Sequence, residues 1–289
     1  MAIASILPRA TFARRARARR HLVRQPTFVL AALWLSLVLV SAVAPGLLTR
    51  YDPYAIDENH ILGPMSAAHW FGTDQFGRDT YTRVVYGTAE SLKAAVLAVL
   101  IGLVVGSLIG LLSGFVAGRV DTAVMRLVDT MLAIPALILS LAILTTLGPG
   151  TISIGIAIGV NSIASIARLM RSEVLSVKER AYVEASRFFG HGTWYRLGRH
   201  VLPNASGSVL TAAILDIGTS ILGVASLSFL GLGAPPPTPE WGSLVAEGRG
   251  FFPTQWWMSI LPGAVIAASV LSVYKVARVL RNSRSANIA

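Results

Sequence analysis

The stretch YVEASRFFGHGTWYRLGRHVLPN, Tyr182–Asn204, is polar and basic, yet it lies between two long apolar runs. Apolar and charged positions alternate in its first half, and then Gly190 and Gly192 interrupt the pattern. Glycine commonly ends a helix, and Thr193 is a suitable N-cap for the next one. We therefore expect a helix, a glycine turn and a second helix that ends at Pro203. Such an element at a membrane surface is typical of a docking site, although a plain amphipathic loop would have the same composition.

The composition favours an all-α integral membrane protein. The chain has 289 residues, of which 54% are hydrophobic and 13% charged, and its mean hydropathy is +0.63. A soluble domain carries about 25% charged residues. The absence of cysteine excludes disulfides and thiolate metal sites, and the five histidines show no ligand spacing, so we expect no metal.

Charge-free runs predict six transmembrane helices, because a bilayer core of about 30 Å requires roughly 20 apolar residues. Pro135 and Pro262 lie inside two of the runs and are expected to kink them. The turn GPG at Gly148–Gly150 divides one long run into two short crossings. The runs are 25–49, 94–118, 130–167 with its two crossings, 209–231 and 250–274.

The distribution of basic residues predicts the orientation. If the N-terminus is inside, 20 of the 25 Lys and Arg residues face the cytoplasm, so both termini are expected there. The first span is expected to be an anchor rather than a cleaved signal, because Pro45 would follow the cleavage-like AVA. The expected segments are a tail at 1–28, an anchor helix at 29–48, an extracytoplasmic segment at 49–90, a transmembrane domain at 91–276 with a cytoplasmic loop at 168–207, and a tail at 277–289.

The N-terminal tail carries a run of arginines, and the second span carries glycines at a regular spacing. The basic run RRARARR at Arg14–Arg20 is expected to bind anionic lipid rather than nucleic acid, because it adjoins an anchor helix. Glycines four residues apart form a bare stripe on the second span, which predicts a tight helix-packing seam. These glycines are Gly102, Gly106, Gly110, Gly114 and Gly118.

Asp216 is the only acid deep inside a predicted span. An ionisable side chain in the membrane is by default a functional candidate. Asp216 could line a translocation path together with Ser220, one turn further on, and contact an amine of the substrate. It could equally be hydrogen-bonded to neighbours such as Ser220, and the sequence leaves both interpretations open.

The chain carries no sign of catalysis. It has three lysines, none of them in a G-x-x-x-x-G-K-[ST] motif, so it has no P-loop route to ATP hydrolysis. No Ser/His/Asp arrangement stands out. We therefore expect no catalytic residue and no cofactor on this chain.

The opening stretch resembles the EAA loop of ABC importer permeases. That loop has Glu-Ala-Ala, a glycine six residues after the Glu, and Leu-Pro eighteen and nineteen after it. The chain has Ser186 in place of the second alanine. The matching residues are Glu184, Ala185, Ser186, Gly190, Leu202 and Pro203.

Other blocks extend the resemblance over roughly residues 20–265. HWFGTDQFGRDTYTRVVYGTAESL, MRLVDTMLAIPALILS, ASLSFLGLGAPPPTPEWG and WWMSILPG resemble the dipeptide/oligopeptide/nickel permease family, and specifically its C-type subunit. The chain departs from that family at Val224, where many members have an acid, and in the run YKVARVLRNS after the last span.

The resemblance implies a type I ABC importer permease with six transmembrane helices in a bacterial inner membrane. It implies a heterodimer with a B-type permease, two ATPase subunits that bind ATP and Mg²⁺, and an extracytoplasmic solute-binding protein. The expected function is import of di- or oligopeptides by alternating access, with nickel chelates or glutathione as alternatives. A self-sufficient secondary transporter would instead need inverted repeats and coupling-ion residues, and apart from Asp216 none is evident.

Overall fold

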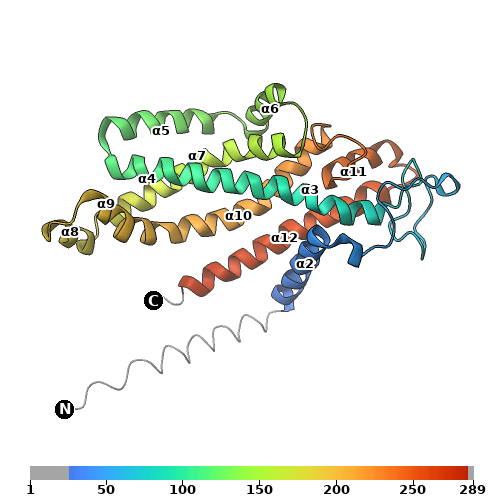
Figure 1. The fold of residues 1–289 in the computed structure, drawn as a ribbon, viewed down its shortest axis with the longest axis horizontal. Helices are drawn as coiled ribbons and strands as arrows, with labels where there is room; N and C mark the ends of the chain where they lie inside the picture. The colour runs from blue at the N-terminus through green and yellow to red at the C-terminus, as the bar shows by residue number, and fades with distance from the viewer. Residues whose placement is uncertain (1–25, 286–289) are drawn as a thin grey trace, which may run out of the picture.

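The protein is a bundle of long helices that run along one axis (Figure 1). The computed structural model describes residues 26–285, and expectations for residues 1–25 and 286–289 lie outside that range. In the described part, secondary structure is helical apart from one isolated bridge between Thr73 and Asp79. Five helical runs are long and apolar enough to cross a membrane, or six if a bent pair is counted as one span. The all-α fold predicted from composition is confirmed.

The first span is helix α2, Pro26–Val43. It ends earlier than the expected bound at residue 48, and a 3-10 turn follows at Pro45–Leu47. Pro45 has no N–H to continue the helical hydrogen bonds, which explains the early end. The Trp34 indole donates to the Ser269 hydroxyl at 3.1 Å and so ties α2 to the last span.

The second span begins well before the charge-free run at 94–118. Helix α3, Thr80–Ile101, a π-turn at Gly102–Gly106 and helix α4, Ser107–Val116, form one run of 37 residues. The carboxylate of Asp79 caps α3 by accepting from the Thr82 backbone N–H at 2.7 Å. The start of α3 therefore lies within the segment 49–90, which the sequence led us to place outside the membrane.

The third span is broken rather than kinked. Helix α5, Gly118–Ala133, and helix α6, Ala136–Leu147, meet at 96°. Ile134 is extended, with φ −84° and ψ 129°, because the residue before a proline disfavours the helical region. Pro135 thus separates two short helices, a stronger effect than the kink expected from the sequence.

Helix α7, Thr151–Lys178, leads to the end of the bundle where α8 and α9 lie (Figure 1). Helix α8, Ala181–Phe188, and helix α9, Thr193–Arg196, follow. A π-turn at Leu197–Val201 then continues directly into helix α10, Leu202–Phe229.

Two local predictions in this region were wrong. Gly192, not Thr193, occupies the N-cap position of α9. Pro203 does not end a helix, because Thr193–Phe229 is one helical run. Pro203 instead lies inside this run, directly after the π-turn at Leu197–Val201, and the Asn204 side chain donates to the His200 carbonyl at 2.6 Å.

The last part of the chain contains helix α11, Trp241–Gly248, and helix α12, Trp257–Ser285. Helix α12 starts after the predicted beginning of its span at residue 250. It also continues through residues 277–285, which we had expected to be a tail. Pro262 lies inside this helix, and the helical assignment is unbroken there.

Four of the five striped glycines pack on α7. A Cβ atom at Gly106 would lie 2.8 Å from the Ile163 carbonyl oxygen, which is closer than real Cβ atoms approach. Gly118 differs, because it is the first residue of α5, with φ +70° and no neighbour within 4 Å. Glycines of α7 face α3 in return, and a Cβ atom at Gly159 would lie 2.8 Å from that of Ile101. Glycines on both sides of the seam therefore allow the close approach of the helices.

Candidate functional site

Helix α8 ends in a hydrogen-bonded glycine turn. Gly190 has φ +81°, its N–H donates to the Arg187 carbonyl at 3.0 Å, and the His191 N–H donates to the Ser186 carbonyl at 3.2 Å. This pair of bonds around a left-handed residue is a Schellman motif. A side chain at position 190 would be strained in that conformation, which gives a physical reason for a glycine six residues after Glu184.

One face of α8 rests on the rest of the molecule. Val183 is 3% exposed and belongs to an apolar cluster that also contains Val174 and Val177 of α7 and Leu197 and Val201 before α10. Helix α8 is therefore packed against the end of α7 and the beginning of α10.

The other face of α8 is exposed and unusually apolar. Glu184 and Ala185 are exposed, and the exposed fractions of Phe188 and Phe189 are each 82%. Trp194 at the start of α9 is 75% exposed. Figure 1 places α8 and α9 at one extreme end of the bundle. Adjacent large apolar side chains at such a position are typical of a surface that contacts a protein or a membrane.

The residues that follow are held by ring contacts. The His191 and Tyr195 rings stack with centroids 4.5 Å apart, and Tyr195 contacts His200 edge-on at 5.8 Å. Leu202 and Pro203 are exposed on the first turn of α10. The residues of the predicted loop thus lie on one short helix–turn–helix unit, with Ser186 buried beneath it.

A polar cavity of about 240 Å³ lies between the first turns of α6, the middle of α7 and the second half of α10. Both predicted path residues, Asp216 and Ser220, line it. Asp216 accepts a hydrogen bond from the Thr219 hydroxyl at 2.7 Å, and not from Ser220. The Ser220 hydroxyl is buried and has no hydrogen-bond partner among the described residues.

Sequence reasoning missed the other polar residues of this cavity. The Asn161 amide donates to the Ser140 hydroxyl at 2.8 Å and to the Ala157 carbonyl at 3.0 Å. A signal was available, because Asn161 is the only side-chain amide in the charge-free run 130–167. Ser162 and Ser165 complete the polar part of the lining.

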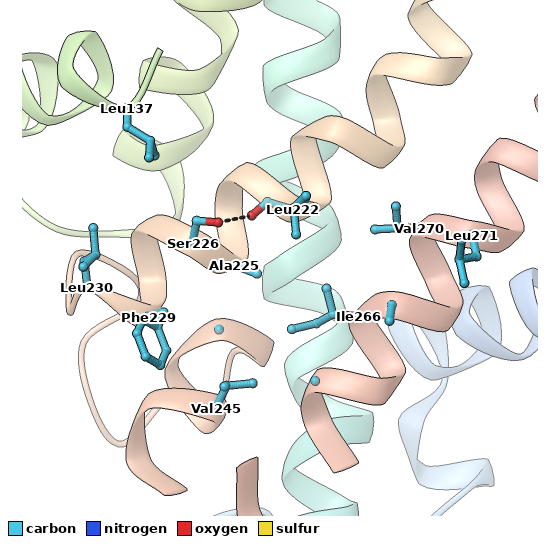
Figure 2. A pocket seen from close by; sticks show the side chains of 13 residues that line it. Leu137, Leu222, Ala225, Ser226, Phe229, Leu230, Val245, Ile266, Val270 and Leu271 are labelled. Atoms are coloured by element: carbon cyan, nitrogen blue, oxygen red, sulfur yellow. Dashed lines mark hydrogen bonds between the residues drawn. The ribbon is translucent and has the colours of Figure 1, made fainter. Parts of the chain in front are cut away.

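A larger cavity of about 680 Å³ lies beside α10 and is almost entirely apolar. Figure 2 shows Leu137, Phe229, Val245 and Ile266 around it, contributed by α6, α10, α11 and α12. The Ser226 hydroxyl also faces this region, but it donates to the Leu222 carbonyl of its own helix at 2.8 Å. No free polar group is therefore offered to a charged ligand there among the lining residues.

A buried polar network closes the opposite end of the bundle, and sequence reasoning did not assign it a role. Arg83 is 1% exposed, and its guanidinium contacts Asp74 at 2.7 Å and Glu247 at 2.5 Å. The Glu240 carboxylate accepts from the Ser91 hydroxyl at 2.8 Å and from two backbone N–H groups at the start of α11. The network joins the segment before α3 to α11.

An ion pair joins α7 to α5 at the end of the glycine seam near Gly114. Arg171 of α7 donates to both oxygens of Asp121 on α5, at 2.6 and 2.5 Å. The Ser113 hydroxyl of α4 donates to the same carboxylate at 2.5 Å. Three helices are thereby joined close to Gly118.

The fold is thus a bundle of helices long and apolar enough to cross a membrane, with an exposed helix–turn–helix unit at one end and a polar cavity between α6, α7 and α10. Residues 102–285 match the family described as "Binding-protein-dependent transport system inner membrane component". The chain belongs to this family and is a multi-pass inner-membrane permease.

Individual relatives are similar over most of their length. The chain is 42% identical to the probable D,D-dipeptide transport system permease protein DdpC of Escherichia coli (strain K12) over 83% of this chain and 81% of that protein. It is also 42% identical to the glutathione transport system permease protein GsiD of Shigella flexneri serotype 5b (strain 8401), over 88% and 84%.

One solved structure supports the fold. It is the crystal structure of an amino acid ABC transporter with histidines, with a TM-score of 0.57 and 19% identity, covering 70% of this chain and 94% of that chain. At this identity the likeness concerns the fold alone, and it agrees with the type I permease architecture.

Proposed function

We propose that this chain is the translocation subunit of an ABC importer for di- or oligopeptides, with the helix–turn–helix unit at residues 181–204 as its ATPase-docking site. The observation that carries the docking role is the exposed face of α8. Phe188 and Phe189 are each 82% exposed at an end of the molecule that membrane lipid would not cover under this orientation.

The proposal assigns ATP and Mg²⁺ to two separate ATPase subunits. It also includes a heterodimer with a B-type permease and an extracytoplasmic binding protein that delivers the substrate. The excess of basic residues in the segments assigned to the inside supports cytoplasmic termini. The docking unit and the C-terminal end of α12 also lie on the same side of the bundle, as this orientation requires (Figure 1). No catalytic step is assigned to this chain.

Peptides are the favoured substrates, because the names of several relatives describe peptide systems. Glutathione is the second candidate. The observation in its favour is the 42% identity to a permease named for glutathione transport. The chain's own residues do not separate these two compounds, since each carries a free amine and a carboxylate.

Co-purification tests the docking role. The chain would be co-expressed with the neighbouring ATPase and B-type subunits and purified through a tag on this chain. Glu184→Arg and Phe188→Ala are expected to lose the ATPase while the B-type subunit remains. Truncation of one fully covered Phe removes about 1.5–3 kcal/mol, which corresponds to roughly ten- to hundred-fold in affinity.

A matched control uses an exposed aromatic residue at the opposite end. Trp70 is 60% exposed there, so Trp70→Ala should retain the ATPase. If Glu184→Arg and Phe188→Ala retain the ATPase as well as Trp70→Ala does, the docking site lies elsewhere. Absence of the ATPase from the wild-type preparation would refute the importer assignment itself.

A further inference from the structure

We propose that the cavity between α6, α7 and α10 binds a primary ammonium group of the transported substrate, with Asp216 as its counter-ion. For a peptide, this group is the N-terminal amine. The inference rests on the proposed transport function and adds a chemical requirement to it. It concerns the twelve residues that line the 240 Å³ cavity.

The charge of the lining is the first argument. Asp216 is the only ionisable residue that lines the cavity, so the site carries one negative charge and no positive one. Thr219 donates to Oδ1 of Asp216, and within residues 26–285 no hydrogen-bond donor is found for Oδ2. A carboxylate oxygen without a partner in a membrane-spanning helix requires a cation, a donor or water.

Hydrogen-bond capacity is the second argument. Asn161 uses its amide N–H₂ group on Ser140 and Ala157, which leaves its carbonyl oxygen as an acceptor. The Ser220 hydroxyl, 1% exposed as a residue, has no partner in the described part of the chain. A primary ammonium has three N–H donors. Asp216, Asn161 and Ser220 offer one acceptor each in a single cavity.

A purely structural role for Asp216 would explain fewer of the observed features than ammonium binding does. The Thr219–Asp216 bond alone would stabilise α10 locally, since the two residues are three positions apart. It would leave the Ser220 hydroxyl and the Asn161 carbonyl without a function. Buried polar groups of native proteins are normally paired, and the buried Ser220 hydroxyl in this lining has no partner within residues 26–285, so it is available to a ligand.

The volume limits which part of the substrate can enter. Sites for whole small ligands are usually about 300–1,000 Å³. The polar cavity is below that range, so it accommodates a terminal ammonium and its first residue rather than a whole peptide. The larger cavity near Ser226 offers no charged group, and we therefore assign the ammonium to the smaller one.

The absence of cysteine from this chain gives a direct assay. Ser165 is exposed and lines the polar cavity, so Ser165→Cys places a single thiol there. In the purified complete transporter, this thiol would be treated with 2-aminoethyl methanethiosulfonate, which carries a primary ammonium, or with its 2-sulfonatoethyl analogue, which carries an anion. Ser226→Cys, in the apolar cavity, is the matched control.

The expected result is that the cationic reagent labels Ser165→Cys about ten-fold faster than the anionic one, relative to the same ratio at Ser226→Cys. Adding Asp216→Asn should remove this preference, and adding Asp216→Glu should restore most of it. L-alanyl-L-alanine should slow the labelling, whereas its N-acetyl derivative should not.

A second readout separates binding from folding. Uptake of L-alanyl-L-alanine by vesicles that contain the complete transporter should fall about ten-fold with Asp216→Asn, while the ATPase still co-purifies. The inference is overturned if the labelling preference is absent or survives Asp216→Asn, if the N-acetyl peptide protects equally, or if uptake is unchanged. Loss of the ATPase from wild type would instead reject the proposed function, so the two failures are distinguishable.

Discussion

The glycine seam makes a quantitative prediction about Gly110. A Cβ atom there would lie 2.8 Å from the Met170 Cβ and 3.0 Å from the Ala167 carbonyl carbon, whereas carbon atoms pack best at about 3.5–4.0 Å. Helices α4 and α7 would have to separate by on the order of 1 Å. Because backbone atoms cannot rotate away, we expect an overpacking cost of about 1–3 kcal/mol.

Helix propensity opposes this cost. Alanine is favoured over glycine in a helix by about 1 kcal/mol, so Gly110→Ala should lose about 0–2 kcal/mol net. The control is Gly207→Ala in α10, where no atom lies within 4 Å of the added Cβ and only the propensity gain applies.

Thermal unfolding of the detergent-solubilised protein measures both variants. For a chain of this size, 1 kcal/mol corresponds to about 2–4 °C in Tm. Gly110→Ala should lower Tm by up to about 8 °C, and Gly207→Ala should leave it unchanged or raise it, so the two variants should differ by at least about 2 °C. A Tm for Gly110→Ala equal to or above that for Gly207→Ala would refute the close contact between α4 and α7.

Three other substitutions test separate features. Arg83→Met removes the nearer of the two buried cations that face Glu247 and leaves Arg78 at 3.6 Å, so it should cost at most about 3–5 kcal/mol in unfolding free energy, measured by thermal unfolding. Trp241→Phe removes the 3.0 Å hydrogen bond to the Val84 carbonyl, and the same assay should show a loss of about 1–3 kcal/mol. Gly190→Ala places a side chain at φ +81° and should weaken ATPase co-purification without loss of the B-type subunit, whereas Gly192→Ala, at an ordinary φ, should have little effect.

Local patterns predicted the parts of the fold that depend on local physics. Apolar runs of sufficient length identified the membrane-crossing segments, and a four-residue glycine period identified a seam whose partner proved to be α7. The sequence did not identify that partner, because small residues allow a close approach to any helix. Gly118 extended the pattern by chance, since it begins α5 and has a positive φ.

The start of α3 was missed because its charges are neutralised over long distances. Arg83 pairs with Glu247, which is 164 positions away in the sequence. A lone arginine suggests an exposed position when only its neighbours in sequence are considered, yet Arg83 is buried in the fold. Charge-free runs therefore understate the length of this helix. The break before Pro135 had a local signal, since Ile134 precedes a proline, and its effect was larger than expected.

The candidate sites, like the fold, could be predicted only where they depend on residues that are neighbours in the sequence. The turn at Gly190 follows from adjacent residues and could be anticipated, whereas the cavity gathers Asp216, Asn161 and Ser140 from three helices. Asp216 is recognisable alone because a carboxylate is rare in a span. Asn161 and Ser140 are ordinary in isolation, and only the packing of α6 on α7 gives them a common role.

The arrangement of these sites suggests how docking and translocation are connected. Val183 of α8 packs in one apolar cluster with the inner ends of α7 and α10. The same two helices carry Asn161 and Asp216 at mid-length. Close-packed interiors transmit displacement rather than absorb it, so we infer that a push on the exposed face of α8 shifts α7 against α10 and changes the cavity between them. Helices α7 and α10 would then connect the docking unit to the cavity, and the proposed ammonium site would change shape when these helices shift.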